Sequence, residues 1–148
     1  MPESQLTQAE ADALMAMDKA KANDLTYAYP TSGGLLMVPL ISVDGREEFV
    51  MDIRRGRIDL AKVTHQLRGR QVVLLIRLDL AGPTHTNPDA ELVPCPHIHR
   101  YREGYADKWA NPLPSTFTNP TDLWQTLQEF MSHCRVVDPP TLDRGLFV

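Results

Sequence analysis

The stretch of residues 35–80 constrains the fold more than any other part of the chain. Apolar and polar side chains alternate along it, and short turn sequences interrupt it at Asp44-Gly45 and at Gly69-Arg70. Alternation with period two is typical of strands with one buried face, and Asp-Gly favours a tight hairpin turn. Because the connections are too short for parallel crossovers, we expect an antiparallel meander. The predicted strands are residues 35–43, 48–54, 57–68 and 71–80.

The same alternation predicts which side chains enter the core. In the second strand Phe49, Met51 and Ile53 share the face that we expect to be buried. One face of the fourth strand carries Val72, Leu74, Ile76, Leu78 and Leu80, and the other carries Val73, Leu75, Arg77 and Asp79. After an irregular segment rich in proline, residues 97–102 alternate again and predict a fifth strand.

Helical patterns flank the predicted sheet. Ser4 or Thr7 can cap a helix that runs to about Asn23, and Thr118 or Thr121 can cap another. The expected fold is one α+β domain over residues 1–148, with a curved antiparallel sheet of about five strands that curls over the N-terminal helix. Its parts are an N-terminal helix (1–24), the sheet (35–102), a C-terminal helix (121–134) and an extended tail (136–148).

Composition limits the setting in which such a domain works. Of its 148 residues 43% are hydrophobic, which is enough for one core, and no apolar run approaches the roughly 20 residues that span a bilayer. No secretory signal is visible, and two cysteines are too few for a disulfide scaffold, so we expect a cytoplasmic protein without a membrane partner. The oligomeric state is open.

Charge is distributed unevenly along the chain. The net charge is −4, which argues against a globally basic nucleic-acid binder, but residues 46–70 contain seven basic and four acidic side chains. A locally basic face is compatible with RNA or another phosphate-bearing partner. Solvated outward positions on strands explain the same pattern equally well.

Histidines are concentrated in one part of the sequence. Four of the five lie within residues 65–99, and strand geometry points His97, His99 and Tyr101 to the same side. His65 shares the face of its strand with Val63 and Leu67, while His85 belongs to the irregular segment that leads into the fifth strand. The catalytic candidates are His97, His99, Tyr101, His85 and His65.

The first chemistry that suits these residues is phosphodiester cleavage without a cofactor. One imidazole would deprotonate a ribose 2′-hydroxyl and another would protonate the leaving oxygen, since the ordinary imidazole pKa lies near about 6.5. Planar guanidinium groups would stabilise the developing charge on phosphorus. The candidates for substrate binding are Arg68, Arg77, Arg100, Arg102 and Lys108.

Two alternatives remain open at this point. His97 and His99 could bind a divalent metal together with His85, Cys95 or Asp89, which would make the protein a metal-dependent hydrolase. In the other alternative the protein is not an enzyme but an inhibitor or antitoxin-like partner of another protein. That alternative predicts no pocket and tolerance of a His97→Ala/His99→Ala double change, since neutral histidines also serve as backbone hydrogen-bond partners.

Three sequence segments together resemble a known family. They are His85-Thr-Asn-Pro-Asp89, Pro96-His-Ile-His-Arg-Tyr-Arg-Glu-Gly104 and Lys108-Trp-Ala110. The pattern resembles small uncharacterised proteins of bacteria and mobile elements, over about residues 35–135. The family is a domain of unknown function, so the resemblance implies neither catalytic residues nor a substrate. It does imply a mobile-element, phage-related or defence setting, in which a toxin-like ribonuclease would be at home.

Overall fold

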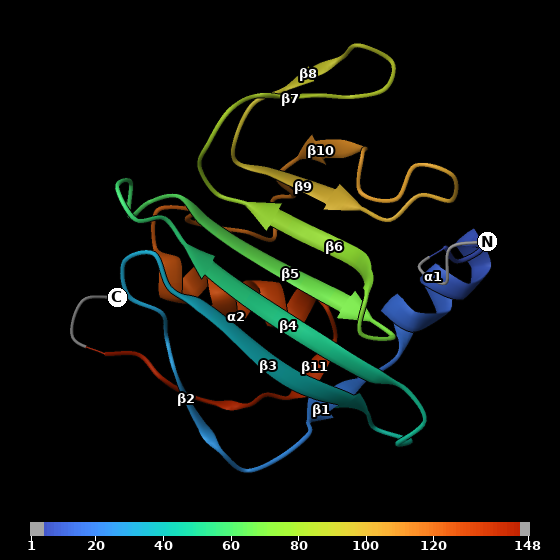
Figure 1. Cartoon of the computed structure of the whole chain (residues 1–148), viewed down its shortest axis with the longest axis vertical. Coiled ribbons are helices and arrows are strands. Elements are labelled where there is room, and N and C mark those ends of the chain that lie inside the picture. The colour runs from blue at the N-terminus through green and yellow to red at the C-terminus, as the bar shows by residue number, and fades with distance from the viewer. Residues whose placement is uncertain (1–4, 146–148) are drawn as a thin grey trace.

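The computed structural model describes residues 5–145 and shows one large sheet with a helix across one of its faces (Figure 1). The large sheet has eight strands in the order β10-β9-β6-β5-β4-β3-β1-β11, and only its β1–β11 pair is parallel. The elements are α1 (Gln8–Ala16), β1 (Lys19–Lys21), β2 (Thr26–Ala28), β3 (Leu35–Ser42), β4 (Glu48–Arg55), β5 (Val63–Gly69), β6 (Val73–Asp79), β7 (His85–Thr86), β8 (Leu92–Val93), β9 (His97–Arg100), β10 (Ala110–Pro112), α2 (Leu123–His133), β11 (Val136–Asp138) and β12 (Thr141–Asp143).

The fold class predicted from the sequence is confirmed, but the sheet is larger than predicted. The meander β3-β4-β5-β6 is antiparallel throughout. The strands β1, β10 and β11, each of three residues, extend both edges of the sheet, so that it has eight strands instead of about five. Strands this short leave no periodic signal, because three residues show alternation only once.

Two further strand pairs lie outside the large sheet. β7 and β8 form a short antiparallel hairpin, and β12 pairs with β2 in parallel. The predicted extended tail therefore contains two strands, β11 and β12, while its apolar end at residues 146–148 lies outside the described residues. Within residues 5–145, no helix is long and apolar enough to cross a membrane.

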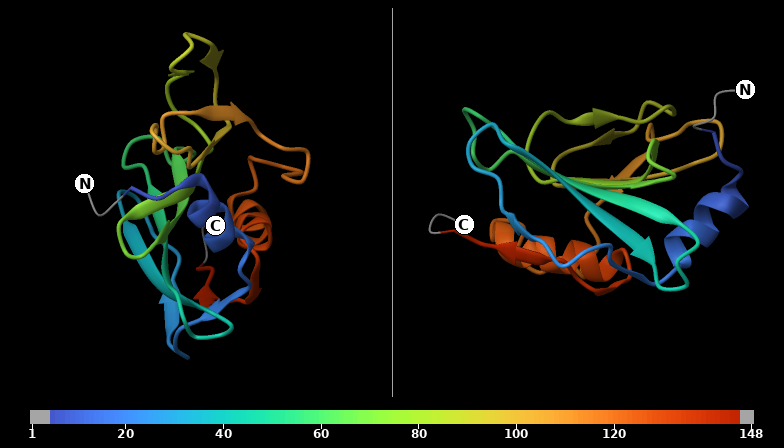
Figure 2. Two further views of the ribbon diagram at one scale, coloured as in Figure 1. Left: turned by 90° about the vertical axis from the view of Figure 1, so that its right-hand side faces the viewer. Right: turned by 60° about the horizontal axis from the view of Figure 1, so that its bottom comes forward.

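The core lies between the sheet and α2. Phe49, Met51 and Ile53 are buried there, as their alternation predicted, and Leu127 and Phe130 of α2 meet them from the other layer. Figure 2 shows α2 lying across one face of the sheet, whereas α1 lies at its end. The prediction that the sheet curls over the N-terminal helix is therefore wrong: the C-terminal helix covers it, because its apolar stripe is the broader one.

A β-bulge in β6 makes part of the predicted assignment of faces wrong. Leu67 pairs with Ile76 but Arg68 pairs with Leu74, so Leu75 is an extra residue in β6. Ile76 and Leu78 are buried as predicted. Before the bulge the alternation is reversed, which buries Val73 and Leu75 and leaves Val72 exposed and Leu74 partly exposed.

Local hydrogen bonds move several predicted boundaries. Thr7 caps α1, as predicted, and the structure adds a capping box with Glu10, while Ser4 lies outside the described residues. The helix ends at Ala16, well before Asn23, because the chain enters β1. Asp122 caps α2 through the backbone N–H of Gln125, so neither predicted threonine is the cap.

The third predicted strand also starts later than its sequence pattern suggests. Residues 57–62 form a loop instead of the start of β5. The carbonyl of Asp59 accepts from the N–H of Lys62, and its carboxylate accepts from the N–H of Ala61. These bonds close a turn, which removes the segment from the sheet.

A buried lysine joins the two helices to the sheet. The Lys19 side chain in β1 has no exposed surface, and its Nζ donates to the carbonyl oxygens of Met15, Met17 and Cys134 at 3.1, 2.8 and 2.9 Å. Its ammonium also lies 4.9 Å from the ring centroid of Phe49. Burial lowers the pKa of Lys19 to about 8. The ammonium thus satisfies carbonyls at the carboxyl ends of both helices, where a cation is favourable.

We expect Lys19→Met to destabilise the protein by about 2–4 kcal/mol, because three buried carbonyls lose a charged donor. Chemical denaturation followed by circular dichroism measures this change. The matched control is Lys21→Met in the same strand, whose partner Asp24 is almost fully exposed, and it should change stability by less than about 0.5 kcal/mol. Equal stability of the two variants would show that the Lys19 ammonium does not stabilise the helix ends.

Candidate functional site

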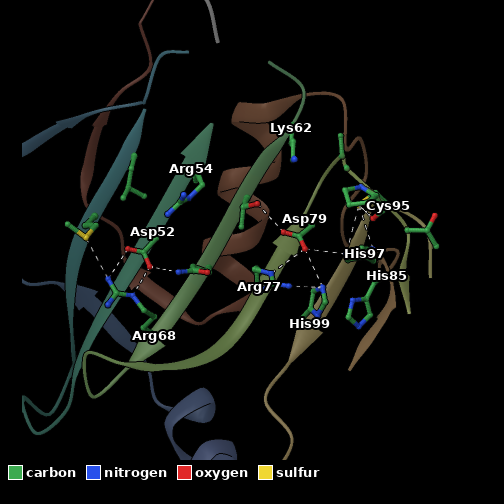
Figure 3. Close-up of a pocket in the computed structure, with 18 residues that line it drawn as sticks. Asp52, Arg54, Lys62, Arg68, Arg77, Asp79, His85, Cys95, His97 and His99 are labelled. Carbon is green, nitrogen blue, oxygen red and sulfur yellow. Dashed lines mark hydrogen bonds and ion pairs between the residues drawn. The ribbon is translucent and has the colours of Figure 1, made fainter. Parts of the chain in front are cut away.

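The face of the sheet opposite α2 carries a polar cleft of about 710 Å³ (Figure 3). Strands β4, β5, β6 and β9 form its floor, and the chain around the β7–β8 hairpin forms one wall. The side chains of this floor come from the alternate strand positions that do not enter the core. The lining residues are Leu35, Met37, Asp52, Arg54, Lys62, Thr64, Gln66, Arg68, Arg77, Asp79, Ala81, Gly82, Pro83, Thr84, His85, Cys95, His97 and His99.

Three histidines meet at the β9 end of this cleft. His97 and His99 lie on the same side of β9, as predicted, and their ring centroids are 4.8 Å apart. The segment before β9 folds back, so that the ring of His85 lies 4.6 Å from that of His99 and 5.9 Å from that of His97. His97 and His99 are 2% and 0% exposed, whereas His85 is only partly buried.

Asp79 lies at the centre of the histidine cluster, and it was not among the predicted site residues. In the β6–β9 pairing Asp79 is opposite His97, and Arg77 is opposite His99. The Asp79 Oδ2 atom is 3.2 Å from His97 Nε2 and 3.3 Å from His99 Nε2. Alternation placed Asp79 and Arg77 on one face, but only the strand order shows that β9 pairs with β6.

Backbone carbonyls fix the orientation of both buried imidazoles. His97 Nδ1 lies 3.1 Å from the carbonyl oxygen of Val93, and His99 Nδ1 lies 2.8 Å from that of Asp107. A carbonyl oxygen only accepts, so each Nδ1 carries a proton and donates it. Both Nε2 atoms therefore point toward Asp79.

Asp79 is held as a carboxylate. Its Oδ1 accepts from the Thr64 hydroxyl at 3.0 Å, and its Oδ2 accepts from Arg77 Nε at 3.2 Å. Burial raises the pKa of Asp79, but the hydrogen bond from His99, the charge of Arg77 and the bond from Thr64 lower it by more, so that it lies well below its usual range. The carboxylate is therefore the fixed negative charge of the cluster.

The basic residues of the cleft differ in how far their charges are compensated. Arg68 makes a bidentate ion pair with Asp52 at 2.7 and 2.9 Å, and Arg77 pairs with both Asp79 and Asp107. Among residues 5–145, neither Arg54 nor Lys62 has an acidic partner within ion-pair distance. The basic stretch at residues 46–70 contained this signal, but we predicted neither residue as part of the site.

Two of the predicted catalytic residues lie outside the cleft. His65 is on the core face of β5, 5.6 Å from the ring of Phe130, because it alternates with the cleft residues Thr64 and Gln66. Tyr101 follows the end of β9, where the period of two no longer holds. Its buried hydroxyl donates to the carbonyl of Leu6 and accepts from the N–H of the same residue. Both side chains are buried, and neither lines the cleft.

Three of the predicted substrate-binding residues also lie elsewhere. Arg100 is on the opposite face of β9 and donates to His133 of α2 at 2.7 Å. Arg102 stacks over the ring of Trp109, with 4.3 Å from its Cζ to the centroid. The side chain of Lys108 does not line the cleft, although its carbonyl oxygen is 2.7 Å from His85 Nε2. The sequence pattern did not predict these positions, because Arg102 and Lys108 lie beyond the end of β9 and Arg100 points to the opposite face of that strand.

Cys95 and Asp89, the other metal ligands considered from the sequence, differ in their position relative to the cleft. Cys95 lines the cleft, and its Sγ is 3.6 Å from His97 Nδ1 and 3.9 Å from Nε2, but it is not one of the three residues whose ligand atoms cluster around Asp79. Burial and the nearby Asp79 charge raise the pKa of the Cys95 thiol. Asp89 accepts from the N–H of Glu91 in the β7–β8 turn and is not part of the cleft.

Fold and site together define an α+β protein with a histidine-centred polar cleft on the open face of its sheet. The chain belongs to the family of unknown function DUF6978, whose model matches residues 6–136. This confirms the family resemblance seen in the sequence and extends it from the sheet to the N-terminal helix. No curated protein and no solved structure matches the chain.

Buried His65 makes stability depend on pH. Neither of its ring nitrogens has a hydrogen-bond partner within the described part of the chain, and burial lowers the pKa of His65 to about 3. The unfolded state therefore binds a proton below about pH 6.5 that the folded state does not bind, so stability falls as the pH drops from about 6.5 toward 3.

We expect His65→Leu to remove this part of the pH dependence and to raise stability at acid pH. Between pH 7 and pH 5, wild-type protein should lose about 2 kcal/mol more unfolding free energy than the variant, because each pH unit below the unfolded pKa contributes about 1.36 kcal/mol. Urea denaturation of both proteins at the two pH values measures the difference. Parallel losses in the two proteins would show that His65 is not buried in the neutral form.

Proposed function

We propose that the protein is a ribonuclease-like, nucleic-acid-directed enzyme that cleaves RNA in this cleft. The observation that carries the proposal is the combination of a partly exposed histidine, His85, with two cations, Arg54 and Lys62, that have no acidic partner among residues 5–145. A polar cleft that brings titratable groups together with free cations is typical of sites that act on phosphate esters.

The charges of the cleft favour an anionic ligand. Asp52 is neutralised by Arg68, and Asp79 is surrounded by Arg77 and two imidazoles. The charges of Arg54 and Lys62 therefore remain available to phosphate oxygens, and they lie on the same lining surface as the histidines. This arrangement supports binding of a nucleic-acid backbone, although the chain as a whole has a net charge of −4.

Apolar side chains at the far end of the cleft suit an unpaired base. Leu35 and Met37 of β3 line the cleft and are 49% and 57% exposed. A single-stranded nucleic acid presents bases that pack against such surfaces, whereas the bases of a duplex are stacked inside it. Single-stranded RNA is therefore the substrate class that we propose.

His85 is the group in the best position to act as a general base. Its Nε2 lies 2.7 Å from the carbonyl oxygen of Lys108 and donates to it, so its Nδ1 carries the lone pair. His97 and His99 are buried, and their nitrogens are engaged by backbone and Asp79, so they hold the cluster together and do not reach the substrate directly. In this proposal the base role predicted for His97 and His99 is therefore assigned to His85, and water takes the acid role.

In the proposed reaction His85 Nδ1 takes the proton of a ribose 2′-hydroxyl. The 2′-oxygen then attacks phosphorus, the bond to the 5′-oxygen breaks, and the 5′-oxygen leaves with a proton taken from water. The products are a 2′,3′-cyclic phosphate and a 5′-hydroxyl. Such an activity would make the protein toxin-like, in keeping with the mobile-element or defence setting implied by the family resemblance, and its expression would then arrest growth of a host cell.

The non-enzymatic alternative, an inhibitor or antitoxin-like partner of another protein, finds less support. It expects no pocket, whereas the cleft has a volume of about 710 Å³. A surface that serves only to bind a protein also does not require buried imidazoles around a carboxylate. The enzyme is therefore the function that the geometry supports best.

The proposal is tested with a labelled single-stranded RNA and a matched 2′-deoxy oligonucleotide that can bind but cannot react. We expect His85→Gln to slow RNA cleavage at least about 100-fold, as loss of a general base does, while binding of the deoxy analogue changes little. Arg54→Ala and Lys62→Ala should each weaken binding and each reduce the slope of log Kd against log salt by about 1.

The matched control is Arg46→Ala in the β3–β4 turn, which lies outside the cleft and should leave both binding and cleavage unchanged. Failure of wild-type protein to bind either oligonucleotide at low salt would refute the proposal. Cleavage that His85→Gln leaves intact would refute the role of His85 as the base. Growth arrest on expression, relieved by His85→Gln, would support the toxin-like setting.

A further inference from the structure

We infer that Asp79, His97 and His99 form a binding site for a divalent first-row transition-metal ion, with Zn²⁺ as the probe used to test it. The ligand atoms are Oδ2 of Asp79 and Nε2 of both histidines, and all three lie within 4.8 Å of one another. Two imidazole nitrogens and one carboxylate oxygen are donors that zinc, manganese and iron accept. Metal binding does not require that the protein cleave RNA.

The separations of the ligand atoms fit one small ion. Asp79 Oδ2 is 3.2 Å from His97 Nε2 and 3.3 Å from His99 Nε2. Ligands bound at 2.0–2.1 Å to a tetrahedral ion lie about 3.3 Å from each other. The two separations between Asp79 and the histidines therefore suit a common ion, and all three ligand atoms lie within 4.8 Å of one another.

The neighbours of the ligands have the arrangement that metal sites require. Each histidine donates its Nδ1 proton to a backbone carbonyl, His97 to Val93 and His99 to Asp107, and this directs both Nε2 atoms toward Asp79. The second oxygen of Asp79 accepts from the Thr64 hydroxyl. Outer hydrogen bonds of this kind orient metal-binding imidazoles and carboxylates in proteins.

An imidazole lone pair that faces a carboxylate oxygen requires a proton or a metal ion between the two atoms. His97 Nε2 is 3.2 Å from Asp79 Oδ2, and two bare acceptors at that distance repel each other unless a proton or a metal ion lies there. Arg77 donates to Asp79 Oδ2 and lies 3.1 Å from His99 Nε2, so the contact between His97 and Asp79 is the one that requires a proton on His97 or a metal ion. Asp79 lines the cleft and keeps 19% of its side chain exposed, so further coordination positions are open to water or substrate.

Arg77 competes with the proposed ion. Its NH2 is 3.1 Å from His99 Nε2 and its Nε is 3.2 Å from Asp79 Oδ2, so the guanidinium occupies positions next to two ligand atoms. Its NH1 pairs with Asp107 at 2.6 Å, which can hold the side chain when those two contacts are lost. Arg77→Met should therefore raise the affinity for a cation, a change that a purely structural role of the cluster does not predict.

The test is calorimetric titration of the full chain with Zn²⁺, after exhaustive dialysis against chelator. We expect one ion per chain, and affinity at least about 100-fold weaker in Asp79→Asn and in His99→Gln, because even outer-shell changes weaken metal binding 10–100-fold. His133→Gln is the matched control, since His133 lies on α2 and accepts from Arg100, and Cys95→Ser controls for binding by the thiol. Both should retain wild-type affinity, and Arg77→Met should bind more tightly.

Co²⁺ absorption of the wild-type protein keeps the inference testable if the buried variants fail to fold. A visible band of four- or five-coordinate Co²⁺ without a thiolate charge-transfer band supports the site, whereas a thiolate band would place the ion on Cys95 and overturn it. Absence of one-to-one binding by wild-type protein, or binding unaffected in the folded Asp79→Asn variant, would also overturn it. RNA binding and cleavage are scored separately, so a protein that binds Zn²⁺ but not RNA refutes only the proposed function.

Discussion

The Lys19 ammonium connects the carboxyl ends of both helices to the large sheet through three hydrogen bonds. It donates to carbonyls at the end of α1 and to the carbonyl of Cys134 just after α2, while its own strand pairs with β3 and β11. The carboxyl end of α2 is thereby fixed at one edge of the sheet. Since the helix covers only one face, the opposite face is left for the cleft.

The two faces of the sheet are so different because single strands contribute to both. In β5 the side chains of His65 and Leu67 are buried on the core side, where His65 contacts Phe130 of α2, while the alternating residues Thr64 and Gln66 line the cleft. In β6 Leu78 enters the core, while its neighbour Asp79 meets the histidines of β9. Core residues and cleft residues therefore alternate along the same strands. A shift of the strand register by one residue would move the core side chains to the cleft face and the cleft side chains to the core.

We propose two activities for the region around Asp79, RNA cleavage and metal binding, and they use different residues. In the proposed function, the residues with access to the cleft, above all His85, Arg54 and Lys62, bind RNA and remove a proton from its 2′-hydroxyl. The buried trio of Asp79, His97 and His99 is the site that we propose for a metal ion, because one ligand atom of each residue lies within 4.8 Å of the others and both Nδ1 atoms are occupied by backbone carbonyls. Arg77 lies between the two groups and contacts both carboxylates that border the cluster, Asp79 and Asp107.

The sequence by itself determined the fold class, the meander of β3 to β6, the core positions of β4 and the shared face of His97 and His99. These features depend on local alternation and turn chemistry, which the order of residues contains. Tertiary structure decided that β9 pairs with β6, which brings Asp79 and Arg77 to the histidines. It also decided that Leu75 bulges and that α2 covers the sheet. Those outcomes depend on contacts between residues far apart in the chain, and no local period contains that information.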